Sequence, residues 1–104
     1  TVEGFSFVDE MANETTKMVK RSVDAYVNKD VKMAEEVIAQ DDIVDDYFSK
    51  IKHDIITMVA EKTADGEFAL DMLMIAKYFE RIGDHATNIA EWVIYSVTGT
   101  HKEA

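Results

Sequence analysis

The chain contains no cysteine and no proline, and it has only four glycines among 104 residues. Without cysteine there can be no disulfide, thiolate metal site or cysteine nucleophile, so a bound metal must be held by oxygen ligands or by one of three histidines. Without proline, helices can run long without a forced break. No apolar run approaches the roughly 20 residues needed to cross a bilayer. These absences favour a soluble chain with long helices.

Charge of one sign dominates the sequence. Eleven Lys and Arg stand against 21 Asp and Glu, which gives a net charge of −10. The summed field repels nucleic acid and anionic lipid surfaces and favours cations and basic protein patches as partners. With 47% hydrophobic and 31% charged residues, the composition is that of a globular protein. We interpret the start at Thr1 rather than Met as the mark of a fragment of a longer protein.

A chain of this length can form one compact core but not two. We therefore expect a single domain, residues 1–104, and nothing in the sequence indicates secretion, so a cytoplasmic location is the default. Hydrophobic periodicity predicts three helices, at about residues 5–28, 30–61 and 67–97. In the first, apolar or small residues alternate in steps of three and four, at Val8, Met11, Thr15, Met18, Ser22 and Ala25.

The connections between these helices are short and polar. Asp30 is a suitable N-cap for the second helix, Gly66 can take a positive φ in the turn before the third, and Gly99 is placed to stop the third. Short connections make neighbouring helices antiparallel, so the predicted fold is all-α, an up-down-up bundle of three long helices. At about 1.5 Å per residue the helices would be roughly 35 to 50 Å long, which predicts a rod.

The same periodicity assigns the buried faces of the second and third helices. On the second helix the apolar stripe comprises Ala34, Val37, Ile38, Val44, Phe48, Ile51, Ile55, Met58 and Val59. On the third it comprises Met72, Ala76, Phe79, Gly83, Ala86, Ala90 and Val97. Gly83 in mid-helix costs about 1 kcal/mol relative to Ala, which predicts a close approach of a neighbouring helix.

Two pairs of acidic residues border these stripes. At 100° per residue, Asp41 and Asp45 fall in line with the inward stripe of the second helix, whereas the acids beside them point outward. Glu80 and Asp84 follow one edge of the third helix. Like charges at i and i+4 cost about 0.2 to 0.5 kcal/mol per pair, so both pairs need a compensating cation. Lysine or arginine could supply it, with Lys77, Arg81 and Lys52 within reach, or a metal ion could.

The run KYFERIGDHATNIAEW at residues 77–92, together with DDIVDDYF at residues 41–48, closely resembles one repeat of the PhoU family of phosphate-uptake regulators. The resemblance covers nearly the whole chain. It implies a three-helix repeat, usually present twice, whose acidic motifs bind clusters of metal ions. Those motifs fall on Glu80 and Asp84 and on Asp41 and Asp45. One repeat is present here, and the VTGTHKEA ending is more similar to the C-terminal one.

The resemblance implies a non-enzymatic cytoplasmic regulator of phosphate uptake and phosphate-starvation signalling. Its expected partners are the ATPase of a phosphate transporter and a sensor histidine kinase, with no nucleic acid and no membrane insertion. The expected cofactors are metal ions held by carboxylates, iron first, with zinc and manganese as alternatives. Two other functions remain open. One is a metal-dependent carboxylate enzyme, although no nucleophile–base pair or Glu-x-x-His motif is present; the other is a histidine phosphotransfer bundle using His85.

Tyr78, His85 and Trp92 repeat every seven residues on the flank of the third helix opposite the acids. Aromatic side chains are enriched at the cores of protein interfaces, so this flank is a candidate contact surface. The alternative is that the three side chains lie over the first helix. If the flank is exposed, a homodimer formed through it would rebuild the six-helix arrangement of a two-repeat protein.

Overall fold

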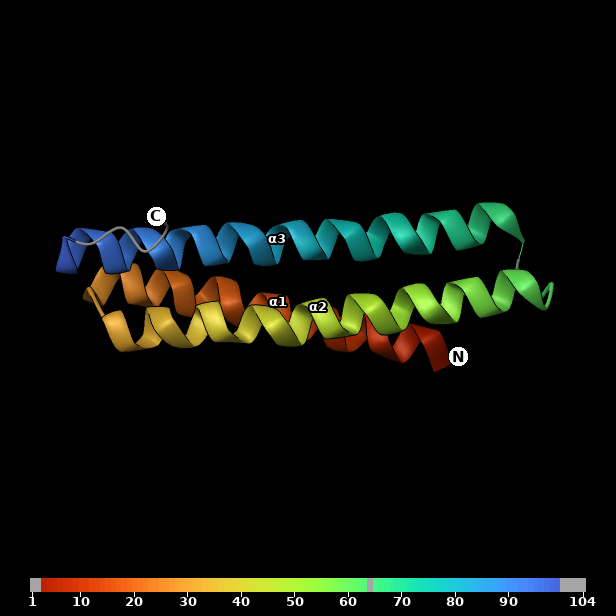
Figure 1. The fold of residues 1–104 in the computed structure, drawn as a ribbon, viewed down its shortest axis with the longest axis horizontal. Coiled ribbons are helices and arrows are strands. Elements are labelled where there is room, and N and C mark those ends of the chain that lie inside the picture. Colours follow the sequence, from red (N-terminus) through yellow and green to blue (C-terminus); the bar gives the residue numbers. More distant parts are fainter. Residues whose placement is uncertain (1–2, 64, 100–104) are drawn as a thin grey trace.

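The computed structural model describes residues 3–63 and 65–99 and shows three helices, α1 (Glu3–Asn28), α2 (Val31–Ala60) and α3 (Gly66–Thr98). No strand is present in the described part of the chain. Successive helices are antiparallel, and α3 lies along both α1 and α2 (Figure 1). The molecule measures 53 × 28 × 17 Å. The predicted all-α, up-down-up bundle and its rod shape are confirmed.

The helix ends follow local capping rules. Asp30 caps α2, its Oδ1 accepting a hydrogen bond from the Met33 N–H at 3.0 Å, as the sequence predicts. Asp65 caps α3 in the same way, through the Phe68 N–H at 2.7 Å. Gly99 ends α3 in the left-handed conformation, with a φ of 74°, also as predicted.

The turn between α2 and α3 differs from the prediction in one respect. Lys62, not Gly66, takes the positive φ, at 58°. Gly66 is instead the first residue of α3, directly after the Asp65 cap. Because the Asp65 side chain caps the helix, α3 begins at Gly66, one residue earlier than predicted with Gly66 in the turn.

The core is formed by one face of each helix. All predicted core positions of α1 are buried or partly buried. On α2 and α3 the prediction holds except for Val59 and Val97, which are 47% and 45% exposed. Figure 1 shows why: α2 extends past the start of α1 at one end of the rod, and α3 reaches past the α1–α2 connection at the other. The prediction missed Ala69 and Val93, which are 5% and 1% exposed.

The different burial of Val93 and Val97 predicts that truncating them to alanine lowers the stability of the bundle by different amounts. Val93→Ala should lower the free energy of unfolding by about 1.5 kcal/mol, since it removes buried methyl groups and leaves a small cavity. Val97→Ala should change it by less than about 0.5 kcal/mol, because the site is already open to solvent. Urea unfolding of both variants measures the difference. Equal effects would mean that the last turns of α3 pack differently.

None of the helices in the described part of the chain is long and apolar enough to cross a membrane.

Candidate functional site

Gly83 marks a close approach of α3 to the other two helices. A methyl group added there would lie 3.4 Å from Asp41 Oδ1 and 3.6 Å from Val44 Cγ1, both on α2, and 3.7 Å from Met18 Sδ on α1. Gly83 is buried, and the close approach that the sequence predicts is confirmed. The Asp41 carboxylate of α2 therefore lies beside the backbone of α3 at Gly83.

Asp41 carries the most perturbed carboxylate of the described residues. Its Oδ1 is buried and has no hydrogen-bond partner. Burial, followed by the negative charges of Asp45, Asp84, Asp42 and Glu80 in that order of importance, together raise the pKa of Asp41 to about 6. An ionised Asp41 is therefore held without compensation beside acids from both α2 and α3.

Asp45 lies one turn further along α2. Its side chain is exposed, unlike that of Asp41, because four residues advance 40° beyond a full helical turn and carry it to the edge of the buried stripe. Partial burial raises the pKa of Asp45, with further contributions from the charges of Glu80, Asp84 and Asp42. The structure thus gathers the four predicted metal ligands at one α2–α3 edge, which we call the acidic edge (Asp41, Asp45, Glu80 and Asp84).

Basic side chains neutralise little of the acidic edge. Lys77 donates to Glu80 Oε1 at 2.8 Å. Within residues 3–63 and 65–99, no ion pair or hydrogen bond reaches the carboxylates of Asp41, Asp45 or Asp84. Lys52 forms no ion pair with Asp41 or Asp45. Its Nζ lies over the Phe48 ring instead, 6.0 Å from the ring centre. Of the four acids, therefore, only Glu80 has its charge compensated by a lysine or arginine.

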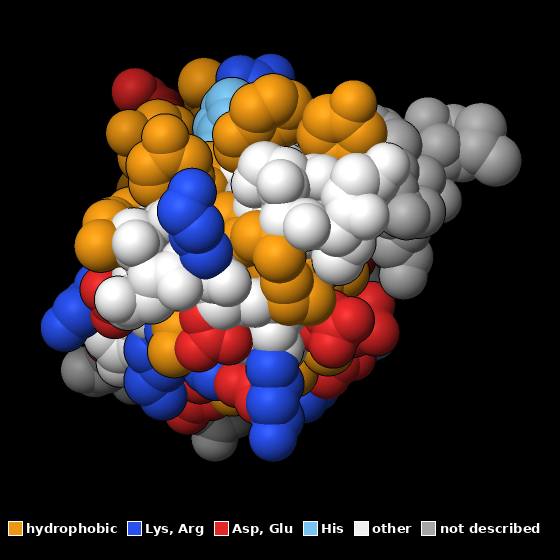
Figure 2. Space-filling model, turned by 90° about the vertical axis from the view of Figure 1, so that its left-hand side faces the viewer, with side chains coloured by type: hydrophobic (Ala, Val, Ile, Leu, Met, Phe, Trp, Pro, Cys, Tyr) orange, Lys and Arg blue, Asp and Glu red, His pale blue; other side chains and the backbone are white. Residues whose placement is uncertain are grey.

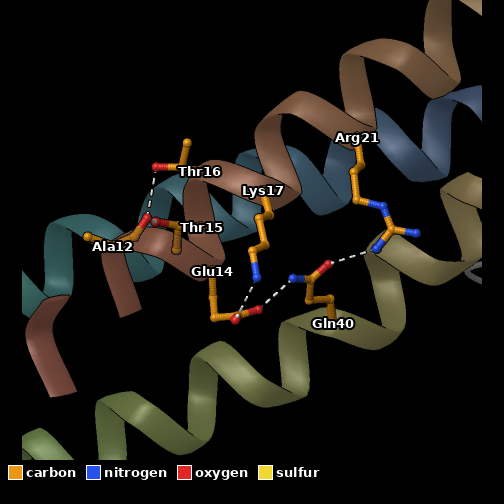
Figure 3. A network of polar contacts seen from close by, with 7 residues as sticks. All are labelled: Ala12, Glu14, Thr15, Thr16, Lys17, Arg21 and Gln40. Carbon is orange, nitrogen blue, oxygen red and sulfur yellow. Dashed lines mark hydrogen bonds and ion pairs between the residues drawn. The ribbon is translucent and has the colours of Figure 1, made fainter. Parts of the chain in front are cut away.

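The polar contacts between α1 and α2 show the opposite pattern (Figure 3). Gln40 Nε2 donates to Glu14 Oε1 at 2.7 Å, and Lys17 lies 3.5 Å from the other Glu14 oxygen. Arg21 donates to Gln40 Oε1 at 3.4 Å and also forms an ion pair with Glu36. Acids on this side of the bundle therefore have their own cations or amides. The acidic edge is different because most of its charge has no partner.

The donor set of the acidic edge suits a hard cation. Carboxylates one turn apart on two packed helices supply the oxygen ligands that iron, manganese and magnesium bind, and the unpartnered Asp41 Oδ1 offers a free lone pair. In the side-chain positions seen here, however, no three or more histidine, aspartate or glutamate side chains of the described residues converge closely enough to hold a metal ion. The chemistry of the residues fits a cation, whereas their present side-chain positions do not form a finished site.

The second candidate surface is the outward flank of α3. Tyr78 is 64% exposed and Trp92 is 55% exposed, and His85 between them is also exposed. The Tyr78 ring contacts Phe79, and the Trp92 ring contacts Tyr95, while Trp92 also lines a hollow together with Val23 and Tyr26 of α1. Figure 2 shows many hydrophobic side chains and a histidine over the top of the molecule, where α3 lies, with some charged side chains among them, whereas most charged side chains lie below. We call this surface the aromatic flank (Tyr78, His85 and Trp92).

A hollow of about 400 Å³ adjoins the aromatic flank where α3 meets the C-terminal half of α1. Its lining is almost entirely apolar and comprises Val23, Tyr26, Asn88, Ile89 and Trp92. The sequence analysis missed the contribution of α1. A feature of the sequence could have indicated it. Val23, Tyr26 and Val27 beside Ala25 give α1 an apolar surface that is too wide for the single buried stripe of a three-helix bundle.

Comparison with known proteins identifies the family to which the chain belongs. The model of the PhoU domain matches residues 8–93. The chain belongs to the PhoU family. Among curated PhoU homologues described as phosphate-specific transport system accessory proteins, that of Clostridium acetobutylicum is 37% identical over 89 residues, 86% of this chain and 41% of its own length. The Thermotoga maritima homologue 1 is 37% identical over 94 residues, 90% of this chain and 40% of its own.

The Pseudomonas aeruginosa PhoU homologue is 34% identical over 97 residues, 93% of this chain and 40% of its own length. The chain therefore spans about two fifths of the length of these curated PhoU homologues, which is consistent with a single PhoU repeat. No solved structure gives a significant match. The PhoU match covers all four acids of the acidic edge and all three residues of the aromatic flank.

Proposed function

We propose that this PhoU-family chain regulates phosphate uptake and phosphate-starvation signalling through contacts with other proteins. The observation that carries this proposal is the PhoU-domain match over residues 8–93, supported by relatives that are named as accessory proteins of phosphate-specific transport. The partners we propose are the cytoplasmic ATPase of a phosphate transporter and a sensor histidine kinase, which places the chain in the cytoplasm. The net charge of −10 suits basic patches on such partners.

The acidic edge is the proposed regulatory metal site. Asp41, Asp45, Glu80 and Asp84 would supply the ligands, to iron first and to zinc or manganese as alternatives. Uncompensated carboxylates, a buried oxygen without a partner and a raised pKa at Asp41 support this assignment. A bound cation would reverse the local field and allow an anion such as phosphate to approach. Without a cation, the same carboxylates repel anions.

We assign no catalytic residue. Among the described residues, no specific observation favours the metal-dependent enzyme. The phosphotransfer alternative would use His85, which is exposed but adjoins Asp84, and that carboxylate opposes an incoming phosphoryl group. The chain is also proposed to form a homodimer through the aromatic flank.

Phosphate uptake in host cells that lack this protein tests the regulatory function. In phosphate-rich medium, uptake of radiolabelled phosphate should rise in these cells and return to the parental rate when the chain is supplied. The Glu80→Gln/Asp84→Asn variant should restore less, and Asp42→Asn/Asp46→Asn, which neutralises two outward acids, should restore fully. An uptake rate that does not respond to the protein at all would overturn the proposed function.

A further inference from the structure

The aromatic flank is the one long face of α3 on which a second copy would meet few carboxylates. Between Met72 and Tyr95, α3 carries three acids, Glu80, Asp84 and Glu91. At 100° per residue all three lie on the side of the acidic edge, centred about 120° around the helix from Tyr78, His85 and Trp92. Two chains that each carry a net charge of −10 repel one another, so an approach is most favourable on this face.

The flank also carries a projecting group and a hollow that fit each other. Tyr78 is among the most exposed of the large apolar side chains, and the hollow lined by Val23, Tyr26, Ile89 and Trp92 lies about three to four helical turns away on the same face. An aromatic ring is the kind of side chain that fills such a pocket at the centre of an interface. Because one chain holds both parts, a symmetric pair would bury both twice.

We propose that a second copy packs on the aromatic flank with the two α3 helices antiparallel and the two-fold axis beside His85. His85 stands seven residues from Tyr78 and seven from Trp92. Antiparallel helices paired at His85 therefore place Tyr78 of each copy against Trp92 and the hollow of the other. A parallel pair would set Tyr78 against Tyr78 and leave both hollows open. This inference rests on the homodimer of the proposed function and gives it a geometry.

Single cysteines test the geometry, since the chain has none of its own. His85→Cys lies beside the axis and should give a covalent dimer under mild oxidation or with a short bis-maleimide. Met74→Cys, exposed on the same flank, is eleven residues from the axis, so its two copies would lie about 33 Å apart and should remain unlinked. Ile56→Cys, exposed on α2, controls for random collision.

Sedimentation of variants with intact helicity tests the contact itself. The wild-type chain should dimerise, Tyr78→Ala should weaken the dimer at least tenfold, and Ile56→Ala should leave it unchanged. A wild-type chain that stays monomeric, linkage through Met74→Cys, or no linkage through His85→Cys in a chain that does dimerise would each overturn the proposal. The proposal would also be overturned if a longer native chain proved monomeric because its additional residues cover the hollow. A dimer that fails to restore phosphate uptake would instead contradict the proposed function and leave this interface standing.

Discussion

Asp41→Asn is expected to stabilise the metal-free protein by about 2 kcal/mol at pH 8 and to have little effect at pH 4. In the folded chain the pKa of Asp41 is raised to about 6 from 3.8. The folded state thus holds the proton more tightly than the unfolded state, and the free energy of unfolding falls as the pH rises between these two values. A shift of this size corresponds to about 3 kcal/mol, which solvent screening at a partly buried group reduces.

The asparagine side chain removes the buried charge and the repulsion from Asp45, Asp84, Asp42 and Glu80. Urea unfolding of wild type and variant from pH 4 to pH 8, in the presence of a chelator, measures the difference. Asp42→Asn is the matched control, because Asp42 is exposed and its neutralisation should change the stability by less than about 0.5 kcal/mol at any pH. A constant difference between Asp41→Asn and wild type across this range would show that Asp41 is not the strained carboxylate.

The sequence predicts those parts of the fold that depend on local patterns. Periodic steps of three and four residues identify the fully buried positions among residues 7–28 of α1 but miss Phe7 and Val19, which pack against the core while partly buried. Capping chemistry identifies Asp30 and Gly99 as helix ends. The angular position of Glu80 and Asp84, calculated at 100° per residue, places them beside the core rather than in it. Gly83 predicts close packing because its propensity cost demands a compensating contact.

Features that depend on relative helix length and lateral position could not be predicted in this way. Val59 and Val97 continue the apolar pattern but lie where one helix extends beyond its neighbours, so periodicity alone misplaces them. The hollow beside Trp92 requires Val23 and Tyr26 of α1, and no pattern within a single helix indicates which residues of another will adjoin it. The lack of partners at Asp41 likewise depends on which lysines reach it, and Lys77 pairs with Glu80 while Lys52 lies over Phe48.

The acidic edge therefore stores electrostatic repulsion that the bundle does not relieve through its own side chains. The network of Glu14, Gln40 and Arg21 shows that acids elsewhere in the same bundle do have partners. A charge cluster left open in this way favours an external cation, because binding would remove both the repulsion and the cost of the buried Asp41 carboxylate. In the proposed function, metal binding and stability would be coupled through the same four carboxylates.

Metal content should consequently be lost in full when two of these ligands are neutralised. Protein purified without chelator is expected to contain iron, manganese or zinc in stoichiometric amounts, and Glu80→Gln/Asp84→Asn should contain none by elemental analysis. Asp42→Asn/Asp46→Asn, which removes the same charge from the outward side of α2, should keep its metal.

Thermal unfolding supplies a second measurement of the same metal site. At a free metal concentration 100 times the dissociation constant, binding to the folded state stabilises a protein by about 2.7 kcal/mol. Metal added to chelator-treated wild type and to Asp42→Asn/Asp46→Asn should therefore raise the midpoint of unfolding, and it should leave that of Glu80→Gln/Asp84→Asn unchanged. A wild-type chain with neither bound metal nor a metal-dependent midpoint, even in excess ion, would contradict the proposed metal site and return these acids to the solvated face of the bundle.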